Sequence, residues 1–230
     1  MRLALHGAAR DGTAGRAWHA AVESAGAVLV PIPIPAPAGV PVGLGCDAVL
    51  VAGPAAGEDA TAGATAALVA FARAGGPVLA IGAGVEILCA LGLLPGRIGE
   101  RAPGATAWPA SHLRVEGRPT PFTSAIPAGR VLRLPEAPGP PYQWQLHDAA
   151  ELQARGQVIF RACDAAGGTR RPEAIAGISN QSGNVVGLLV AEEIVAGEGA
   201  QLLRSLGMHL RAKLRSPLPR PRGTRGRGLG

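Results

Sequence analysis

The hydrophobic positions in the first hundred residues form two kinds of pattern. Short apolar runs predict strands at 2–7, 27–34, 46–53 and the start of 78–96, and the continuous run at 46–53 is typical of a strand buried on both faces of a parallel sheet. Segments 13–26 and 64–76 instead place apolar residues on one side at helical spacing. Strands that alternate with helices of this kind predict a right-handed βαβ series.

The segment 78–96 contains a short apolar strand that leads through the turn Gly82-Ala83-Gly84 directly into a helix. In enzymes such a strand–turn–helix elbow holds a nucleophile at the sharp turn. The three turn residues here supply no nucleophile, metal ligand or charge. The sequence therefore predicts an elbow whose turn carries no reactive side chain.

Beyond Gly96 the pattern changes to short extended pieces separated by Gly and Pro. These pieces predict an antiparallel or mixed extension of the sheet: HLRVEG, GRVLRLP, GQVIFRA, EAIAGISN and GNVVGLLV. The segment 198–215 predicts a final amphipathic helix. The prolines in 31–43 remove ladder donors, which predicts a loop at the rim of the sheet. The predicted fold class is α/β, with a mostly parallel central sheet flanked by helices.

The composition indicates one globular domain followed by a basic tail. Hydrophobic residues make up 47% and charged residues 17% of the 230 residues, so the chain can bury a sizeable core. Five of the 22 Lys and Arg residues lie in 215–230, which holds no acidic residue, and this leaves 17 basic against 16 acidic residues in 1–214. We therefore expect a near-neutral domain over 1–214 and a disordered tail rich in Pro, Gly and Arg over 215–230.

The tail is a candidate for contact with RNA or an acidic protein surface, because clustered arginines bind phosphate in a salt-sensitive way. Arginine replaces lysine throughout the chain, which holds only one lysine, Lys213, among its 22 Lys and Arg residues. The arginines of the tail are therefore weak evidence for phosphate binding, and a solvated tail without a partner is favoured. The N-terminus becomes polar too early for a signal peptide, and every apolar stretch is shorter than the ~20 residues of a membrane span. We expect a cytoplasmic protein without a membrane anchor.

The three cysteines predict neither a disulfide framework nor a metal site. Cys46, Cys89 and Cys163 are odd in number and lack C-x-x-C spacing. We expect Cys46 to open a strand far from the elbow, Cys89 to lie in a helix packed on the sheet, and Cys163 to lie on a later strand. Free, mostly buried thiols are the expected state.

Four stretches together carry a resemblance to a known family: GGPVLAIGAGVEILCALGLLPG, HLRVEGRPTPFTS, GQVIFRACD and IAGISNQSGNVVGLLV. In order and spacing they are similar to class I glutamine amidotransferases, and within that class to the glutaminase subunit of phosphoribosylformylglycinamidine synthase, which supplies ammonia to purine synthesis. The resemblance covers roughly residues 1–213. It implies a flavodoxin-like fold and a Cys-His-Glu triad, with the cysteine on an elbow of pattern G-x-C-x-G-x-Q.

In such an elbow the cysteine lies beside a helix N-terminus, which lowers the thiol pKa, while the histidine accepts the proton and backbone N–H groups hold the oxyanion. In this chain Gly82 occupies the position of the cysteine, and the helix glycine is retained as Gly84. Glu86 replaces the glutamine of the pattern. The resemblance therefore implies that the nucleophile is absent.

The other parts of the implied site are altered as well. Where the family has a His and a Glu two residues apart after the strand 184–190, the chain reads AEEI, so Ala191 takes the histidine position and only the acid remains, as Glu193. The oxyanion loop has a double glycine in the family and Gly53-Pro54 here, and proline has no N–H to donate. The resemblance implies that the general base and one oxyanion donor are absent too.

No other residue is expected to replace these groups. None of the histidines stands directly after the late strand, where a base is expected: His6, His19, His112, His147 and His209. His6 ends the first strand and could face the same rim of the sheet as the elbow. Glu192 and Glu86 could form a small acidic cluster, but surface solvation is favoured, and neither a metal site nor a cofactor is predicted. A family loop that carries His and Glu is reduced to PEAPGPPYQW in 135–144.

The resemblance thus implies a fold that is kept while its glutaminase chemistry is given up. We expect a non-catalytic subunit that docks, as a structural or regulatory partner, on a large ATP-dependent synthetase subunit resembling the purine-pathway one or on an active glutaminase paralogue. Two alternatives stay open. One is a working glutaminase or other hydrolase with recruited residues, and the other is a small-molecule sensor that uses the space left at Gly82 and Ala191.

Overall fold

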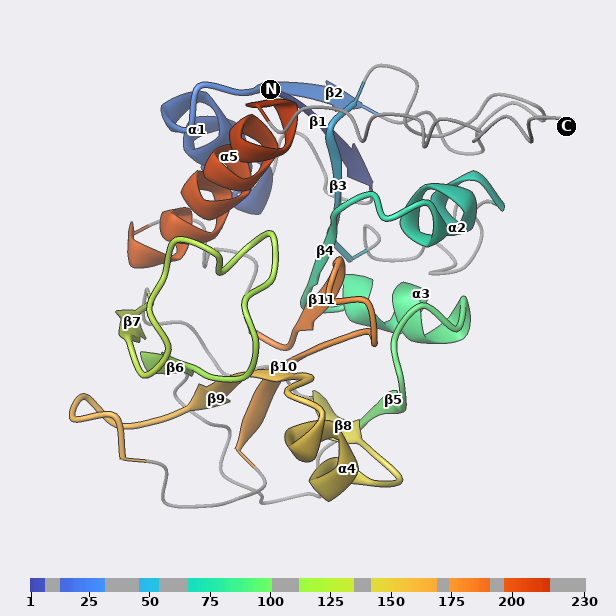
Figure 1. The fold of residues 1–230 in the computed structure, drawn as a ribbon, viewed down its shortest axis with the longest axis vertical. Coiled ribbons are helices and arrows are strands. Elements are labelled where there is room, and N and C mark those ends of the chain that lie inside the picture. The colour runs from blue at the N-terminus through green and yellow to red at the C-terminus, as the bar shows by residue number, and fades with distance from the viewer. Residues whose placement is uncertain are drawn as a thin grey trace, which may run out of the picture.

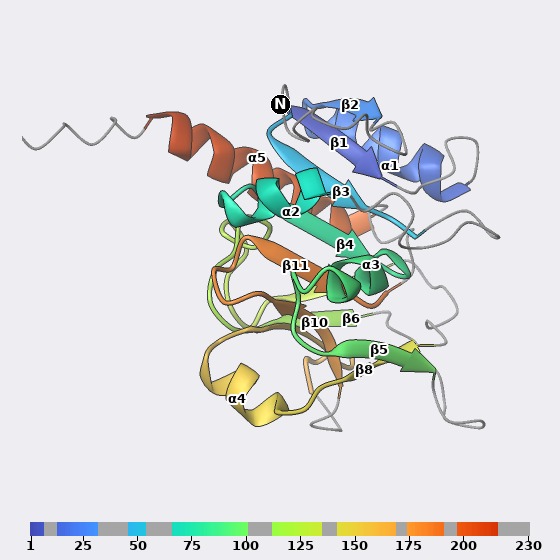
Figure 2. The same cartoon turned by 90° about the vertical axis from the view of Figure 1, so that its right-hand side faces the viewer.

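The structure is a computed structural model that describes residues 1–6, 13–31, 46–53, 66–100, 112–134, 142–168, 174–190 and 197–215. These residues form a nine-stranded sheet with helices on both faces (Figures 1 and 2) and a separate two-stranded sheet. The described α-helices are α1 (Thr13–Ser24), α2 (Ala66–Arg73), α3 (Gly84–Ala90), α4 (Ala149–Ala154) and α5 (Ala200–Arg215). A short 3-10 helix, η2 (Gly197–Gly199), precedes α5.

Five parallel strands form one half of the large sheet, in the order β2-β1-β3-β4-β11. Their bounds are β1 (Arg2–His6), β2 (Val28–Pro31), β3 (Ala48–Val51), β4 (Val78–Ile81) and β11 (Val185–Leu188). This is the strand order of flavodoxin-like folds, in which ligands bind outside the carboxyl ends of the strands. The predicted α/β class, with a parallel sheet flanked by helices, is confirmed.

Antiparallel strands form the other half of the sheet, as the short extended pieces after residue 96 predicted. From β11 outward the order is β10, β9, β6 and β7, and each strand is antiparallel to its neighbour. Their bounds are β10 (Ile175–Ser179), β9 (Val158–Ala162), β6 (His112–Val115) and β7 (Val131–Arg133). The antiparallel extension widens the sheet on the side of β11, away from β1.

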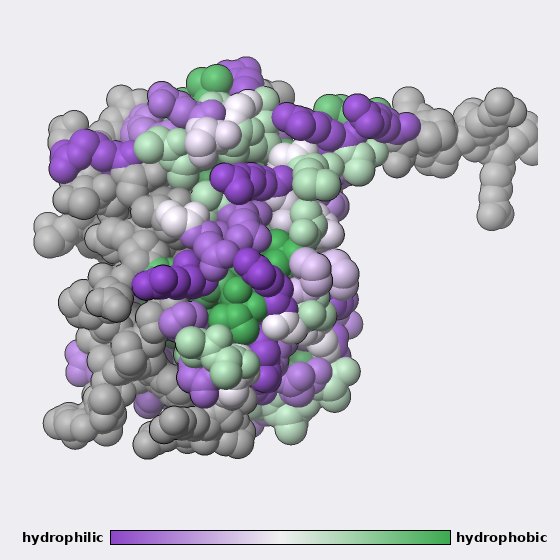
Figure 3. Space-filling view, turned by 90° about the vertical axis from the view of Figure 1, so that its left-hand side faces the viewer, coloured by the Kyte–Doolittle hydropathy of each residue, from purple (hydrophilic) through white to green (hydrophobic). Residues whose placement is uncertain are grey.

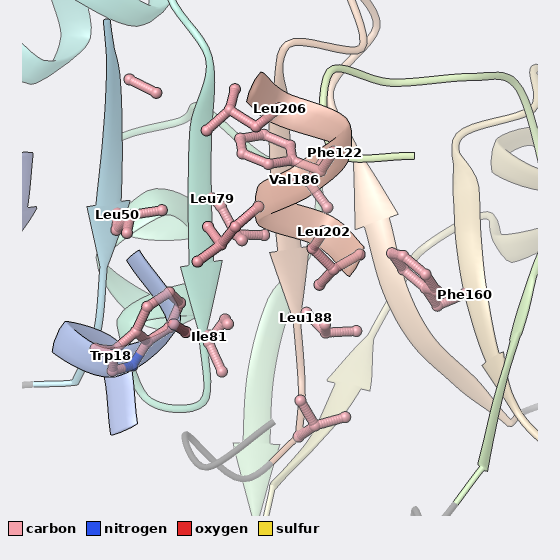
Figure 4. Packing of buried hydrophobic residues seen from close by; sticks show 14 of the residues in the cluster. Trp18, Leu50, Leu79, Ile81, Phe122, Phe160, Val186, Leu188, Leu202 and Leu206 are labelled. Carbon is pink, nitrogen blue, oxygen red and sulfur yellow. The ribbon is translucent and has the colours of Figure 1, made fainter. Parts of the chain in front are cut away.

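Alternate residues of the parallel strands point to opposite faces of the sheet, and each face has its own core. One core lies under α1 and α5 and contains large buried side chains from all these elements (Figure 4): Trp18, Leu50, Leu79, Ile81, Val186, Leu188, Leu202 and Leu206. The other lies under α2 and α3: Val49, Val51, Leu68, Ala72, Val78, Ala80, Val85, Ile87 and Leu88. This alternation explains why the central strands β3, β4 and β11 are apolar at every position.

Two described features were not predicted. A small antiparallel sheet pairs β5 (Arg97–Glu100) with β8 (Tyr142–Gln145), and helix α4 follows it with Asp148 as its N-cap. Trp144 of β8 packs close to the backbone of Gly187, because a Cβ at Gly187 would lie 3.3 Å from the indole ring. The small sheet is thereby attached to the face of β11 that also packs against α3.

The remaining expectations fall partly outside the described residues. The final helix was predicted over 198–215 and is observed as α5, Ala200–Arg215. The proline loop after Pro31 and the tail after Arg215 lie outside the described residues. Among the helices that the structure describes, none is both long enough and apolar enough to cross a membrane.

Candidate active-site elbow

The turn after β4 has the shape of an elbow although its first residue has no side chain. Gly82 has a φ of 59°, in the left-handed region that glycine adopts without strain. Its N–H donates to the carbonyl oxygen of Leu188, 3.0 Å away at the end of β11. The carbonyl oxygen of Gly82 accepts from the N–H of Val85 at 3.2 Å, within the first turn of α3. One glycine with positive φ therefore carries the chain from strand into helix.

Gly84, the first residue of α3, lies directly against the backbone at the end of β3. A Cβ at this position would lie 2.5 Å from the carbonyl oxygen of Val51 and 2.9 Å from the carbonyl carbon of Ala52. Only a residue without a Cβ lets α3 begin this close to β3. The glycine that the elbow pattern retains is therefore explained by helix–strand packing.

The elbow and the ends of β3 and β11 meet at one edge of the sheet. In the parallel register Ile81 lies beside Leu188, so β4 and β11 end together. Gly53 is buried two residues beyond β3. The structure thus brings Gly53 and Gly82 to the same edge, where the resemblance expects the oxyanion loop and the nucleophile. Three of the sequence-predicted positions lie outside the described residues: Pro54, Ala191 and Glu193.

The other predicted elbow residues are placed on α3 or just before it. Ala83 is the N-cap of α3 and provides no side-chain hydrogen bond. Glu86 lies in the first turn with an exposed side chain, where its negative charge interacts favourably with the helix dipole. The exposure of Glu86 agrees with the favoured surface solvation, and Glu192, its partner in the less favoured acidic cluster, lies outside the described residues.

None of the chain's three thiols is activated. Burial, together with the charge of Glu86, raises the pKa of Cys89 to about 11. Burial also raises the pKa of Cys46, where Asp47 adds to the effect, and that of Cys163, where the nearby Arg114 opposes it. Since the thiolate is the reactive form of cysteine, these thiols are poor nucleophiles at neutral pH.

The positions of the cysteines agree only in part with the expectation. Cys89 lies in α3 and Cys46 lies at the edge opposite to the elbow, as predicted, but Cys46 precedes β3 by two residues instead of opening the strand. Cys163 was expected on a strand but follows β9, which ends at Ala162. All three are free and partly exposed rather than mostly buried, because each lies near an end of its element.

The histidines are distributed over several elements. His6 ends β1 in register with Val51 of β3, so its backbone lies at the edge where the elbow is found. His112 lies on β6, which β10 and β9 separate from β11. His147 is exposed, and His19 and His209 lie on α1 and α5. Burial and the charge of Lys213 lower the pKa of His209.

Within the described ranges, no three His, Cys, Asp or Glu side chains come close enough together to hold a metal ion. At the elbow the described residues contribute backbone N–H and C=O groups, small glycines and one exposed carboxylate. The side chains of the elbow itself, from Gly82 to Glu86, supply neither a nucleophile nor a histidine base for acyl transfer. The part of PEAPGPPYQW that is described, from Tyr142 onward, forms β8.

Comparison with solved structures defines the class of this fold. One chain of PurLQS from Thermotoga maritima matches with a TM-score of 0.69 and 24% identity, over 91% of this chain and 98% of that one. The glutaminase domain of Trypanosoma brucei CTPS, with bound acivicin, matches with a TM-score of 0.59 and 14% identity, over 93% and 94% of the two chains. The fold is that of the class I glutamine amidotransferases.

Comparison with curated sequences identifies the family. The chain is 36% identical over 158 residues to phosphoribosylformylglycinamidine synthase subunit PurQ from Nitrobacter winogradskyi. The aligned region covers 63% of this chain and 68% of that protein. It is 37% identical over 162 residues to PurQ from Symbiobacterium thermophilum, over 64% and 69% of the two proteins. No protein-family profile matches the chain. The chain belongs to the PurQ family.

Proposed function

We propose that this chain is a non-catalytic member of the PurQ family, which acts as a structural or regulatory subunit instead of a glutaminase. It docks on a large ATP-dependent synthetase subunit that resembles the purine-pathway one, or on an active sister glutaminase. The observation that carries the proposal is the elbow itself. The backbone turn is complete, yet the residue at its apex is Gly82, which has no atom that can attack a carbonyl.

The thiols of the chain argue against a recruited nucleophile. A substitute for the elbow cysteine has to be deprotonated near neutral pH, which requires a nearby positive charge or base. In this chain burial raises the pKa of all three thiols, and for Cys89 on α3 burial and the charge of Glu86 together raise it to about 11. The working-glutaminase alternative is therefore the less supported one.

The core around the elbow is intact, which supports a continuing need for the fold. The strands that lead to the site, β3, β4 and β11, are buried at every position. Gly84 retains the close contact with Val51 that lets α3 begin beside β3. Loss of selection on the whole protein would be expected to damage these packed positions as readily as the site, since core substitutions are costly.

The names of the relatives indicate what kind of partner this chain has. The matching curated proteins are named as a subunit of phosphoribosylformylglycinamidine synthase, and the matching structure is named PurLQS. A chain with the same fold and without a nucleophile can still cover the same surface of a synthetase. The inherited fold does not fix the present reaction, so the synthetase can also belong to a related pathway.

The proposal is tested by reconstitution with the large synthetase subunit from the same host. Size-exclusion chromatography with light scattering should show a complex, and that complex should use ammonia but not glutamine as nitrogen donor. A parallel test uses a glutamine-mimicking electrophile with intact-mass detection, and no cysteine should be labelled. Failure to associate with either the synthetase or a sister glutaminase, or glutamine-dependent synthesis by this chain without a sister glutaminase, would overturn the proposal.

A further inference from the structure

A cavity of about 470 Å³ lies at the edge of the sheet opposite to the elbow. Its walls include Met1 before β1, Asp47 before β3 and Pro77 before β4, which are the amino ends of parallel strands. From Pro77 to Gly82 the extended chain spans ~16 Å at ~3.3 Å per residue. The cavity is therefore separate from the candidate active-site elbow.

One wall of this cavity is a stripe along α5. Gly207, Leu210, Arg211 and Leu214 line it at the spacing i, i+3, i+4, i+7, which places them on one side of the helix. The facing wall comes from the end of α2 and the segment after it, including Phe71, Ala74 and Gly76. We call the space between these walls the α5 groove.

The facing wall is held firmly in place. The Phe71 ring packs directly on Gly76, since a Cβ at Gly76 would lie 2.4 Å from it. The side chain of Asn184 donates to the carbonyl oxygens of Ala72 and Gly76, both at 2.8 Å, and so ties the end of α2 to the start of β11. A preformed wall of this kind reduces the entropy lost when a segment binds.

The α5 groove is basic as well as apolar. Arg211 and Lys213 line it, and α5 contains no acidic residue. The single acidic residue among the lining residues, Asp47, already accepts the N–H of Arg2 at 2.8 Å. The 15 residues that follow α5 in the sequence add further arginines and no acid. With two cationic side chains against one carboxylate, the lining carries a net positive charge and is complementary to negative charge.

The wall that α5 contributes to the cavity ends in an exposed apolar side chain. Residues 211–215 are exposed, and Leu214 is 86% exposed although it also lines the cavity. Figure 2 shows this end of α5 extending past the rest of the molecule, and Figure 3 shows hydrophilic and hydrophobic residues side by side on the arm that leads into the tail. An occupant that fills the cavity and also covers the exposed Leu214 side chain has to extend beyond the cavity.

We propose that the α5 groove binds an amphipathic, acidic segment of a partner protein. The segment inserts apolar side chains between Leu210 and Phe71, covers Leu214, and places Asp or Glu side chains against Arg211 and Lys213. An amphipathic segment laid in a groove is a recurring mode of protein recognition. The proposal does not depend on the loss of catalysis, because the groove and the elbow lie at opposite edges of the sheet.

Other occupants fit these features less well. The chain's own segment 216–230 carries arginines and no acidic residue, and it would be repelled by Arg211 and Lys213. A second copy would present the same basic helix. A small anionic molecule could fill the cavity, but it would leave much of the exposed Leu214 side chain uncovered.

The experiment places the photocrosslinker p-benzoylphenylalanine at position 214 of the full chain, expressed in its native host. A matched control places it at Ala154, which is exposed on α4, at a distance from the groove. We expect position 214 to crosslink to one segment of one partner protein, in which Asp or Glu residues accompany bulky apolar residues. Position 154 should not crosslink to that segment.

The crosslinked segment is then made as a fluorescein-labelled peptide, and its binding to the purified full chain is measured by anisotropy. Leu214→Asp and Lys213→Glu should each weaken binding about 10-fold, and added salt should weaken it further. Both side chains are exposed, so the fold is not at risk. Arg204→Glu is the matched control, because Arg204 is exposed on α5 but does not line the groove, and it should change binding by less than about twofold.

Several results would overturn the proposal. Crosslinks from position 214 only to the chain's own tail, to a second copy or to a small molecule would do so, as would no crosslink at all. Equal weakening by Arg204→Glu and Lys213→Glu would show general charge attraction and no specific groove. A chain that proved to be an active glutaminase would refute the proposed function and leave this inference standing.

Discussion

The contact between Gly84 and β3 gives a quantitative prediction for Gly84→Ala. The new methyl carbon would lie 2.5 Å from the carbonyl oxygen of Val51 and 2.8 Å from its carbonyl carbon. These are backbone atoms of a buried central strand, so they cannot rotate aside, and the cost falls at the upper end of the ~1–3 kcal/mol typical of overpacking. Alanine regains up to ~1 kcal/mol of helix propensity. The free energy of unfolding should therefore fall by about 2 kcal/mol.

This prediction is measured by urea and thermal unfolding of the purified chain. For a protein of this size the melting temperature should fall by roughly 4–8 °C. Gly207→Ala in α5 is the matched control, because the nearest side-chain atoms, on Met1, lie 3.9 and 4.0 Å from its Cβ position, and it should raise the free energy of unfolding by ~0.5–1 kcal/mol. A Gly84→Ala variant as stable as the wild type would refute the packing explanation of the retained glycine.

Three further predictions follow from the same structure. Gly82→Cys should release no glutamate from glutamine, because residues 189–194, directly after β11, include no histidine, and the φ of 59° should cost ~1 kcal/mol of stability in urea unfolding. The rate of Cys89 alkylation, measured by mass spectrometry, should rise about tenfold per pH unit up to a pH of about 11. Fast alkylation at pH 7 would contradict the raised pKa of this thiol. Glu116→Gln should lower the free energy of unfolding by ~2–3 kcal/mol, because the 12%-exposed Glu116 carboxylate bridges two arginines. Glu151→Gln, which removes one partner of an exposed ion pair, should lower it by less than ~0.5 kcal/mol. Equal losses for these two variants would contradict that distinction.

The strands and helices of the parallel half could be predicted from the sequence because their signals are local. The run VLAI is buried on both faces, and the following Gly82 and Gly84 mark a turn and a close approach within seven residues. The order of the strands in the sheet was accessible through the resemblance and the general preference for parallel βαβ units. Periodicity in short windows is enough for this part of the fold.

The pairing of β5 with β8 could not be predicted in the same way. It joins residues 97–100 to 142–145 across more than forty positions, and half of β5 is exposed, so neither strand has a buried apolar run. The α5 groove could not be predicted either, because its lining residues come from elements that are far apart in the sequence. The partial exposure of the cysteines was also missed, because residue type predicts average burial and not the position at an element's end.

For the candidate site, the sequence located the elbow and the structure supplied its geometry. The resemblance implied that Gly82 and Gly53 belong to one site, and the structure places both beyond the carboxyl ends of parallel strands, where ligands bind in such folds. The hydrogen bond from Gly82 to Leu188 and the contact of Gly84 with Val51 could be established only from the structure. The roles of Ala191, Glu193 and Pro54 stay predictions, since these residues lie outside the described ranges.

The most direct test of the account is the rate of glutamate release from glutamine by the purified chain, alone and in complex with its synthetase subunit and that subunit's substrates. The account predicts a rate equal to the protein-free background in both states, because Gly82 has no nucleophilic atom. Glutamate release above background that depends on this chain, and that disappears when one of its cysteines is replaced by serine, would contradict the central claim.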